Sequence, residues 1–168
     1  MFVLVRAVTY VALFCGLVLV VLPTRLLSPA GIRPPEALGA AQVTGSVITI
    51  GGGALALWCI FTFVVVGRGT PAPFDPPRRL VVRGPYAVVR NPMYIGAGLA
   101  LAGASLFYRS PALLLYAVGF VLATHFFVVL YEEPALRRAF GTEYDLYCRR
   151  VRRWWPRMSE RDRSGAAA

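Results

Sequence analysis

Three long apolar runs constrain the fold of this chain more than any other feature. They extend from Phe2 to Leu22, from Val43 to Val66 and from Ala112 to Tyr131. Each is close to the ~20 residues that a helix needs to cross a hydrocarbon layer of about 30 Å. A shorter run at 94–108, followed by a Ser-Pro pair, predicts a helical hairpin with the last run. The sequence therefore predicts an all-α, polytopic membrane protein, a single domain over 1–168 with four spans at about 2–22, 43–66, 94–108 and 112–131.

The composition favours a membrane protein over a soluble one. Apolar residues make up 57% of the 168 residues and charged residues only 15%, with a mean hydropathy of +0.60. Soluble domains carry about 25% charged residues. The first run is similar to a signal peptide in having Arg6 before an apolar segment, but Leu22-Pro23-Thr24-Arg25 has no small-x-small cleavage pattern. We therefore expect 2–22 to be retained as a signal anchor.

The arginines predict how the chain is oriented in the bilayer. All 18 basic residues are arginine; five lie in the loop 67–93 and nine after Tyr131, against three on the opposite side and Arg6 at the N-terminus. Because basic residues that flank spans favour the cytoplasm, we expect a multi-pass protein of a bacterial-type inner membrane, with both termini and the loop 67–93 cytoplasmic. This bias and the attraction of anionic headgroups explain the net charge of +10. We expect the lipid bilayer, and no nucleic acid, as a partner.

The cysteines and glycines indicate packing rather than chemistry. Cys15, Cys59 and Cys148 show no CxxC spacing, so neither a disulfide framework nor a metal site is indicated. The triplet Gly51–Gly53 and the small residues from Gly96 to Gly103 lie within predicted spans, where glycine commonly lets two helix backbones approach each other. We expect both groups to face other helices, or the second group to make room for a flat ligand.

The segment from Arg83 to Gly96 is a polar island between two apolar runs. Its Gly-Pro pair predicts a turn, Asn91 an N-cap, and Pro92 the first turn of the next helix. A helix N-terminus presents free N–H groups with a partial positive charge, which suits a carboxylate. Arg90 would add a guanidinium fork for the same group.

Glu132 and Glu133 form a second polar island at the end of the last apolar run. Adjacent glutamates at a membrane interface can be no more than a solvated helix end, and Arg90 can equally be a headgroup anchor. His125, the only histidine, precedes Glu132 by seven residues and shares its helix face. It is either a packing histidine with a hydrogen bond or a residue that lines the same cavity. If the islands meet, their arginine, helix N-terminus, tyrosines and carboxylates suit a zwitterionic ligand with an aromatic part.

The stretch 134–153 has an amphipathic pattern. Apolar residues recur at every third or fourth position, with arginines on the remaining face. This pattern predicts one helix that lies on the membrane surface and caps the site. Trp154 and Trp155 follow as an interfacial anchor, and the polar residues from Ser159 onward predict a disordered tail.

An ordered series of motifs covers about Arg78 to Pro156. It consists of Gly84-Pro85-Tyr86-x-x-x-Arg90-Asn91-Pro92-x-Tyr94-x-Gly96, Glu132-Glu133, Phe140-Gly141-x-Glu143-Tyr144-x-x-Tyr147 and Val151-x-Arg153-Trp154-x-Pro156. This series resembles the integral-membrane methyltransferases of the isoprenylcysteine carboxyl methyltransferase and phospholipid methyltransferase group. The first two spans add a match of topology.

The resemblance implies an enzyme that uses S-adenosylmethionine on the cytoplasmic side and transfers its methyl group in line to a lipophilic acceptor from the membrane. By position, the implied cofactor contacts are Tyr86, Asn91, Pro92, Met93, Tyr94 and Glu132, together with Leu80 and Val81 in the stretch 78–81. Arg90 joins them as the guanidinium fork. The candidate catalytic residues are Glu132, Glu133 and Arg90, and a glutamate is preferred to His125 if the protein supplies a base.

Two positions depart from the family pattern. Asn91 replaces a usual histidine, and an amide keeps a hydrogen bond but does not titrate. Val128 stands where isoprenylcysteine enzymes have an arginine for the substrate carboxylate. This argues against a prenylcysteine and leaves an amine, a thiol or another lipid-like acceptor open. The alternative to an enzyme is a non-catalytic membrane scaffold or a small transporter subunit, whose charged residues only anchor helix ends.

Overall fold

The computed structural model describes residues 16–27, 35, 37–67 and 80–157, and this part of the chain is helical, without a strand. Its α-helices are α2 (Leu22–Leu27), α3 (Ala40–Thr62), α4 (Pro92–Phe107), α5 (Pro111–Phe127), α6 (Glu133–Phe140) and α7 (Thr142–Arg150). Three π-helical stretches extend them: η1 (Leu17–Val21), η2 (Phe63–Gly67) and η4 (Val128–Glu132). A 3-10 turn, η3 (Gly84–Ala87), precedes α4. The predicted all-α class is confirmed.

Two helices are long and apolar enough to cross a membrane by length and composition. They are α3, with 23 residues, and the continuous helix Pro111–Phe140, with 30 residues. Leu17–Leu26 and α4 are apolar but shorter. Large apolar side chains on α3, α5 and η4 are exposed, as contact with lipid requires, among them Val47, Ile50, Phe61, Leu115, Phe126 and Leu130. Most of the predicted span 2–22, residues 68–79 of the predicted loop 67–93 and the tail from Ser159 lie outside the described residues.

Each of the long helices begins with local chemistry that fixes its first turn. The side-chain oxygen of Gln42 accepts a hydrogen bond from the Gly39 N–H at 3.1 Å, before α3. The Ser110 hydroxyl accepts one from the Leu113 N–H at 3.3 Å, at the start of α5. Asn91 takes the N-cap position of α4, with Pro92 directly after it, although the Asn91 side chain makes no capping hydrogen bond. The predicted boundary at Asn91 and Pro92 is therefore confirmed.

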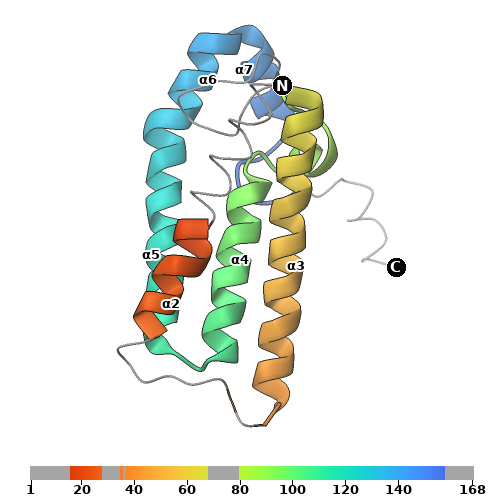
Figure 1. Ribbon diagram of the computed structural model, residues 1–168. Helices are drawn as coiled ribbons and strands as arrows, with labels where there is room; N and C mark the ends of the chain where they lie inside the picture. Colours follow the sequence, from red (N-terminus) through yellow and green to blue (C-terminus); the bar gives the residue numbers. More distant parts are fainter. Residues whose placement is uncertain (1–15, 28–34, 36, 68–79, 158–168) are drawn as a thin grey trace, which may run out of the picture.

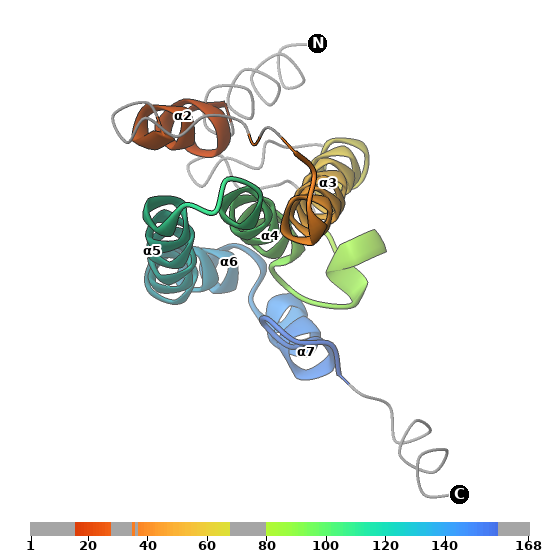
Figure 2. The same ribbon diagram turned by 90° about the horizontal axis from the view of Figure 1, so that it is seen from below.

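The packing of α3 against α4 relies on backbone contact. The two helices lie side by side in both views (Figure 1, Figure 2). A Cβ atom on Gly52 would lie 2.5 Å from the Gly96 carbonyl oxygen, and one on Gly103 would lie 2.6 Å from the Gly45 carbonyl oxygen. The predicted close approach is thus confirmed for Gly52, whereas Gly51 and Gly53 face open space. We call this contact the α3–α4 seam.

Helix α5 covers the other side of α4. Figure 2 shows α4 between α3 and α5, with α2 beyond them. A hydrogen bond ties the N-terminal part to this layer, because the Tyr116 hydroxyl donates to the Val18 carbonyl at 2.8 Å. Leu113 is 1% exposed at the start of α5. The described core is therefore a layer of three helices with one short helix against it.

The expected single helix over 134–153 is wrong, because the chain forms two helices there. Gly141 has φ +51°, a backbone conformation that favours glycine, and it separates α6 from α7. In Figure 1 both helices lie at the end of the layer where α3 and α5 finish and α4 begins. The polar islands of the sequence are at this same end, which we call the polar end.

Candidate functional site

Glu133 is the centre of the polar end. It is 8% exposed and accepts two hydrogen bonds from the Arg153 guanidinium, from Nε to Oε1 at 2.6 Å and from Nη2 to Oε2 at 2.9 Å. Arg90 Nη2 lies 3.2 Å from the same Oε1. The bonds from Arg153 use both carboxylate oxygens of Glu133. Because Arg90 also lies beside it, Glu133 connects its own helix end to the loop before α4 and to the segment around Arg153.

Arg90 lies in the loop just before α4 and is largely occupied by protein partners. Besides Glu133, its Nη1 donates to the Tyr144 hydroxyl at 3.4 Å and to the Cys148 sulfur on α7. Its side chain is 12% exposed. The Nε atom is buried and has no hydrogen-bond acceptor among the described residues. Arg90 therefore connects the loop to both the α5 end and α7.

Glu132 points to a different neighbour from Glu133. Its Oε2 accepts a hydrogen bond at 3.0 Å from the hydroxyl of Tyr94, in the first turn of α4. The π-helical stretch η4, closed by the Glu133 N–H and the Val128 carbonyl, contains Glu132 and ends directly before Glu133. Glu132 therefore contacts the first turn of α4, whereas Glu133 contacts Arg90 in the loop before α4 and Arg153.

The segment Val151–Trp154, which we call the C-terminal strap, lies against the loop before α4. The Arg90 N–H donates to the Arg152 carbonyl at 2.9 Å, and the Asn91 amide donates to the Arg153 carbonyl at 3.3 Å. Val89 and Arg152 form a parallel bridge. The Asn91 side chain is thus turned toward the strap.

His125 meets the strap as well. The indole Nε1 of Trp154 donates to His125 Nδ1 at 3.1 Å. Because an indole N–H only donates, His125 Nδ1 accepts this hydrogen bond. Trp154, expected as a membrane anchor, is instead a half-buried partner of α5, whereas Trp155 is 76% exposed.

Buried tyrosines connect α7 to the turn η3. The Tyr147 hydroxyl donates to the Tyr86 carbonyl at 2.6 Å. Burial raises the pKa of Tyr147 and also that of Tyr86, so both phenols keep their protons at neutral pH. The hydrogen bond to Glu133 raises the pKa of Arg153 above its ordinary value. The Arg153 guanidinium and the Glu133 carboxylate therefore both stay charged at this end.

The remaining predicted contacts are mostly parts of the packing. Val81 and Tyr86 are buried with Cys59 of α3, and Met93 packs against this cluster. Leu80 packs against the cluster of Tyr144, Tyr147 and Val151. Pro92 is among the most deeply buried residues. The structure thus brings every predicted site residue to one end of the helix layer.

Sequence reasoning missed the partners of the glutamates and of His125. The motif around Val151 contains Arg153 and Trp154, and the pattern of α7 contains Tyr144 and Tyr147, but these had been interpreted as family markers or as an amphipathic face. Charge balance could have indicated such a partner, because a buried glutamate needs a cation beside it. The sequence does not say which of its 18 arginines supplies it.

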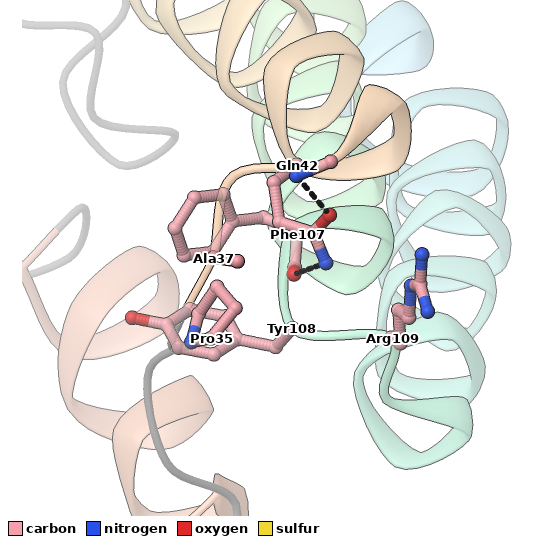
Figure 3. Close-up of a pocket in the computed structure, with 7 residues that line it drawn as sticks. Pro35, Ala37, Gln42, Phe107, Tyr108 and Arg109 are labelled. Atoms are coloured by element: carbon pink, nitrogen blue, oxygen red, sulfur yellow. Dashed lines mark hydrogen bonds between the residues drawn. The ribbon is translucent and has the colours of Figure 1, made fainter.

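A pocket of about 380 Å³ lies at the opposite end of the layer. It is lined by Pro35, Ala37, Gly39, Gln42, Phe107, Tyr108 and Arg109, at the start of α3 and the end of α4 (Figure 3). None of the predicted site residues contributes to it. We therefore place the candidate site at the polar end and not at this pocket.

One comparison with known proteins gives a match. Residues 38–143 match the family model described as phospholipid methyltransferase. This range extends from just before α3 into α7, and it contains both polar islands but not the C-terminal strap. No match was found among curated proteins or among solved structures.

Proposed function

The chain belongs to the phospholipid methyltransferase family, whose members are methyltransferases of lipophilic substrates, and we propose that it transfers a methyl group from S-adenosylmethionine to a lipid-like acceptor. The observation that carries this proposal is the hydrogen bond between Tyr94 and Glu132, which joins the two polar islands. This pair lies at the start of α4 and the end of α5, next to helix faces that are apolar and exposed. An acceptor dissolved in the bilayer therefore has a direct approach to it.

The chemistry of this pair fits the cofactor. S-adenosylmethionine supplies a methyl group on a positively charged sulfur, together with an ammonium group and ribose hydroxyls. The Glu132 carboxylate accepts hydrogen bonds from such donors, and the Tyr94 ring attracts a cation at its face. The N-terminus of α4 carries a partial positive charge, which suits a carboxylate. We assign ligand contact to Glu132 and Tyr94.

Arg90 and Glu133 receive a different role in this proposal. Each neutralises the other, and both are held by protein groups. They act by fixing the loop before α4 relative to the end of α5, which keeps the distance between Tyr94 and Glu132 constant. Holding two reactants in the right orientation supplies a large part of the rate in reactions of this type. The excess of arginines near the polar end favours the cytoplasmic side for the site.

Binding of the cofactor in detergent tests the proposal. We expect purified protein to bind S-adenosylmethionine at about micromolar level by calorimetry, a free energy near −8 kcal/mol. Tyr94→Phe removes the donor of the hydrogen bond, and Glu132→Gln removes the carboxylate charge but keeps an oxygen that accepts. Each variant should weaken binding at least about tenfold, the equivalent of 1.4 kcal/mol. Glu143→Gln, on the exposed face of α7, is the control.

Product analysis identifies the acceptor. Membranes incubated with protein and labelled cofactor should yield a methylated lipid in the organic extract, by mass spectrometry. Folded protein that binds no cofactor would overturn the proposal and favour the scaffold or transporter subunit. In that case Glu132→Gln would change membrane insertion or assembly only.

A further inference from the structure

The C-terminal strap makes contacts with three separate parts of the site. Its backbone accepts hydrogen bonds from Arg90 and Asn91 in the loop before α4. The Arg153 side chain binds Glu133 at the end of α5, and the Trp154 indole binds His125 within α5. A segment that only lay next to the site would not be expected to bind three separate parts of it, through backbone carbonyls, a guanidinium and an indole.

We propose that Arg153 is a positioning residue for the methyl transfer, acting through Glu133 to fix the direction of Glu132. This inference rests on the proposed function, and it adds a residue outside the motifs that contact the ligand. Glu132 and Glu133 are consecutive residues of a continuous helix, so their side chains point about 100° apart. Anchoring Glu133 toward the strap therefore sets the rotation of the helix end that aims Glu132 at Tyr94.

The geometry of the contact requires arginine at position 153. The guanidinium donates from Nε to one oxygen of Glu133 and from Nη2 to the other. Such a fork defines the plane of the carboxylate, whereas a lysine ammonium acts as a point charge and leaves that plane free. Arg90 lies near one oxygen only, so it balances charge without defining orientation. The two arginines are not equivalent.

Five variants, among them the single variant Glu133→Gln, test this role by the affinity for S-adenosylmethionine, measured by calorimetry on full-length protein in detergent. Arg153→Gln should weaken binding about tenfold or more, and Arg153→Lys should recover only part of the loss. Arg150→Gln removes a charge three residues away from an exposed position and should stay within about twofold. If Arg153 acts through Glu133, the double variant Glu133→Gln/Arg153→Gln should bind about as weakly as the weaker single variant.

A readout without any ligand separates this inference from the proposed function. The indole ¹H–¹⁵N signal of Trp154, assigned with Trp154→Phe, reports its hydrogen bond to His125. Arg153→Gln should shift this signal in the free protein, and Arg150→Gln should not. Wild-type protein that binds no cofactor overturns the proposed function, while the indole shift still tests whether Arg153 holds the strap. The positioning role is overturned if Arg153→Gln binds the cofactor within twofold of wild type, if the losses simply add, or if the indole signal does not move.

Discussion

Along the α3–α4 seam two helix backbones meet through glycine, whereas at the polar end side chains from four separate segments meet through charge and hydrogen bonds. The seam has Gly52 and Gly96 at one level and Gly45 and Gly103 at another. The polar end has Glu133 between Arg90 and Arg153. The seam depends on glycines, which have no side chain, whereas the polar end depends on which side chains bind one another.

This difference shows how the molecule separates support from chemistry. Close backbone contact, with the Thr49 hydroxyl donating to the Gly45 carbonyl at 2.8 Å and to the Ala100 carbonyl at 3.3 Å, suits a helix pair in lipid, where packing replaces the hydrophobic effect. The charged network instead pairs ionic side chains that are largely withdrawn from solvent. The close-packed seam therefore fixes the position of the start of α4, which includes Tyr94. The charged network determines which side chains surround Tyr94.

The largest effect should come from Glu133→Gln. The change leaves Arg90 and Arg153 close together without their shared carboxylate. Removing one partner of a buried ion pair costs about 3–5 kcal/mol, and we expect the lower end of this range because the Arg153 side chain is 31% exposed. The measurement is the free energy of unfolding by denaturant titration in detergent micelles.

The matched control for that change is Glu143→Gln, which should alter stability by less than about 0.5 kcal/mol as an ordinary surface substitution. High salt should reduce the loss caused by Glu133→Gln only slightly, because screening acts weakly on buried pairs. A loss below about 1 kcal/mol would place Glu133 among exposed ion pairs and would break the comparison between the two regions.

The next largest effect should come from Gly52→Ala in the seam. The added methyl group would lie 2.5 Å from the Gly96 carbonyl oxygen and 2.6 Å from the Ala100 nitrogen, so the helices must separate. Overpacking of this kind costs about 1–3 kcal/mol. Gly51→Ala is the control, because nothing lies within 4 Å of its Cβ position, and alanine should be neutral or stabilising there. Equal stability of the two variants would show that the seam is not close-packed at Gly52.

The two regions also differ in how well the sequence predicts them. The seam follows from a local pattern, since small residues recur within apolar helices, and the sequence indicated the triplet Gly51–Gly53 and the start of α4 at Pro92. It did not distinguish Gly52 from Gly51 and Gly53, because the face that meets α4 depends on the rotation of α3. A local pattern therefore predicts that two helices come into contact, but not which residues of each helix face the other.

The polar end was predicted as a set of residues but not as a set of contacts. The sequence named Glu132 as a cofactor contact and both glutamates as catalytic candidates, but it did not indicate that Glu132 binds Tyr94 while Glu133 binds two arginines. Gly141 lies within the stretch 134–153, but its positive φ, and hence two helices in place of one, depends on how α7 packs on the loop. Contacts between residues 20 to 62 positions apart carry this information, and no local pattern contains it.

The smallest expected effect, from Tyr147→Phe, tests whether the polar end also depends on a neutral hydrogen bond. The phenol is buried and donates to the Tyr86 carbonyl at 2.6 Å, and its raised pKa keeps the proton in place at neutral pH. Its loss should cost about 1–2 kcal/mol, because a buried carbonyl loses its partner, and the cost should not change with salt. Tyr131→Phe, which keeps the ring that stacks on Phe127 at an exposed position, should leave the free energy of unfolding unchanged. A salt-dependent loss for Tyr147→Phe would mean that the tyrosine acts through the Arg90–Glu133 network, and that the polar end is a single electrostatic unit.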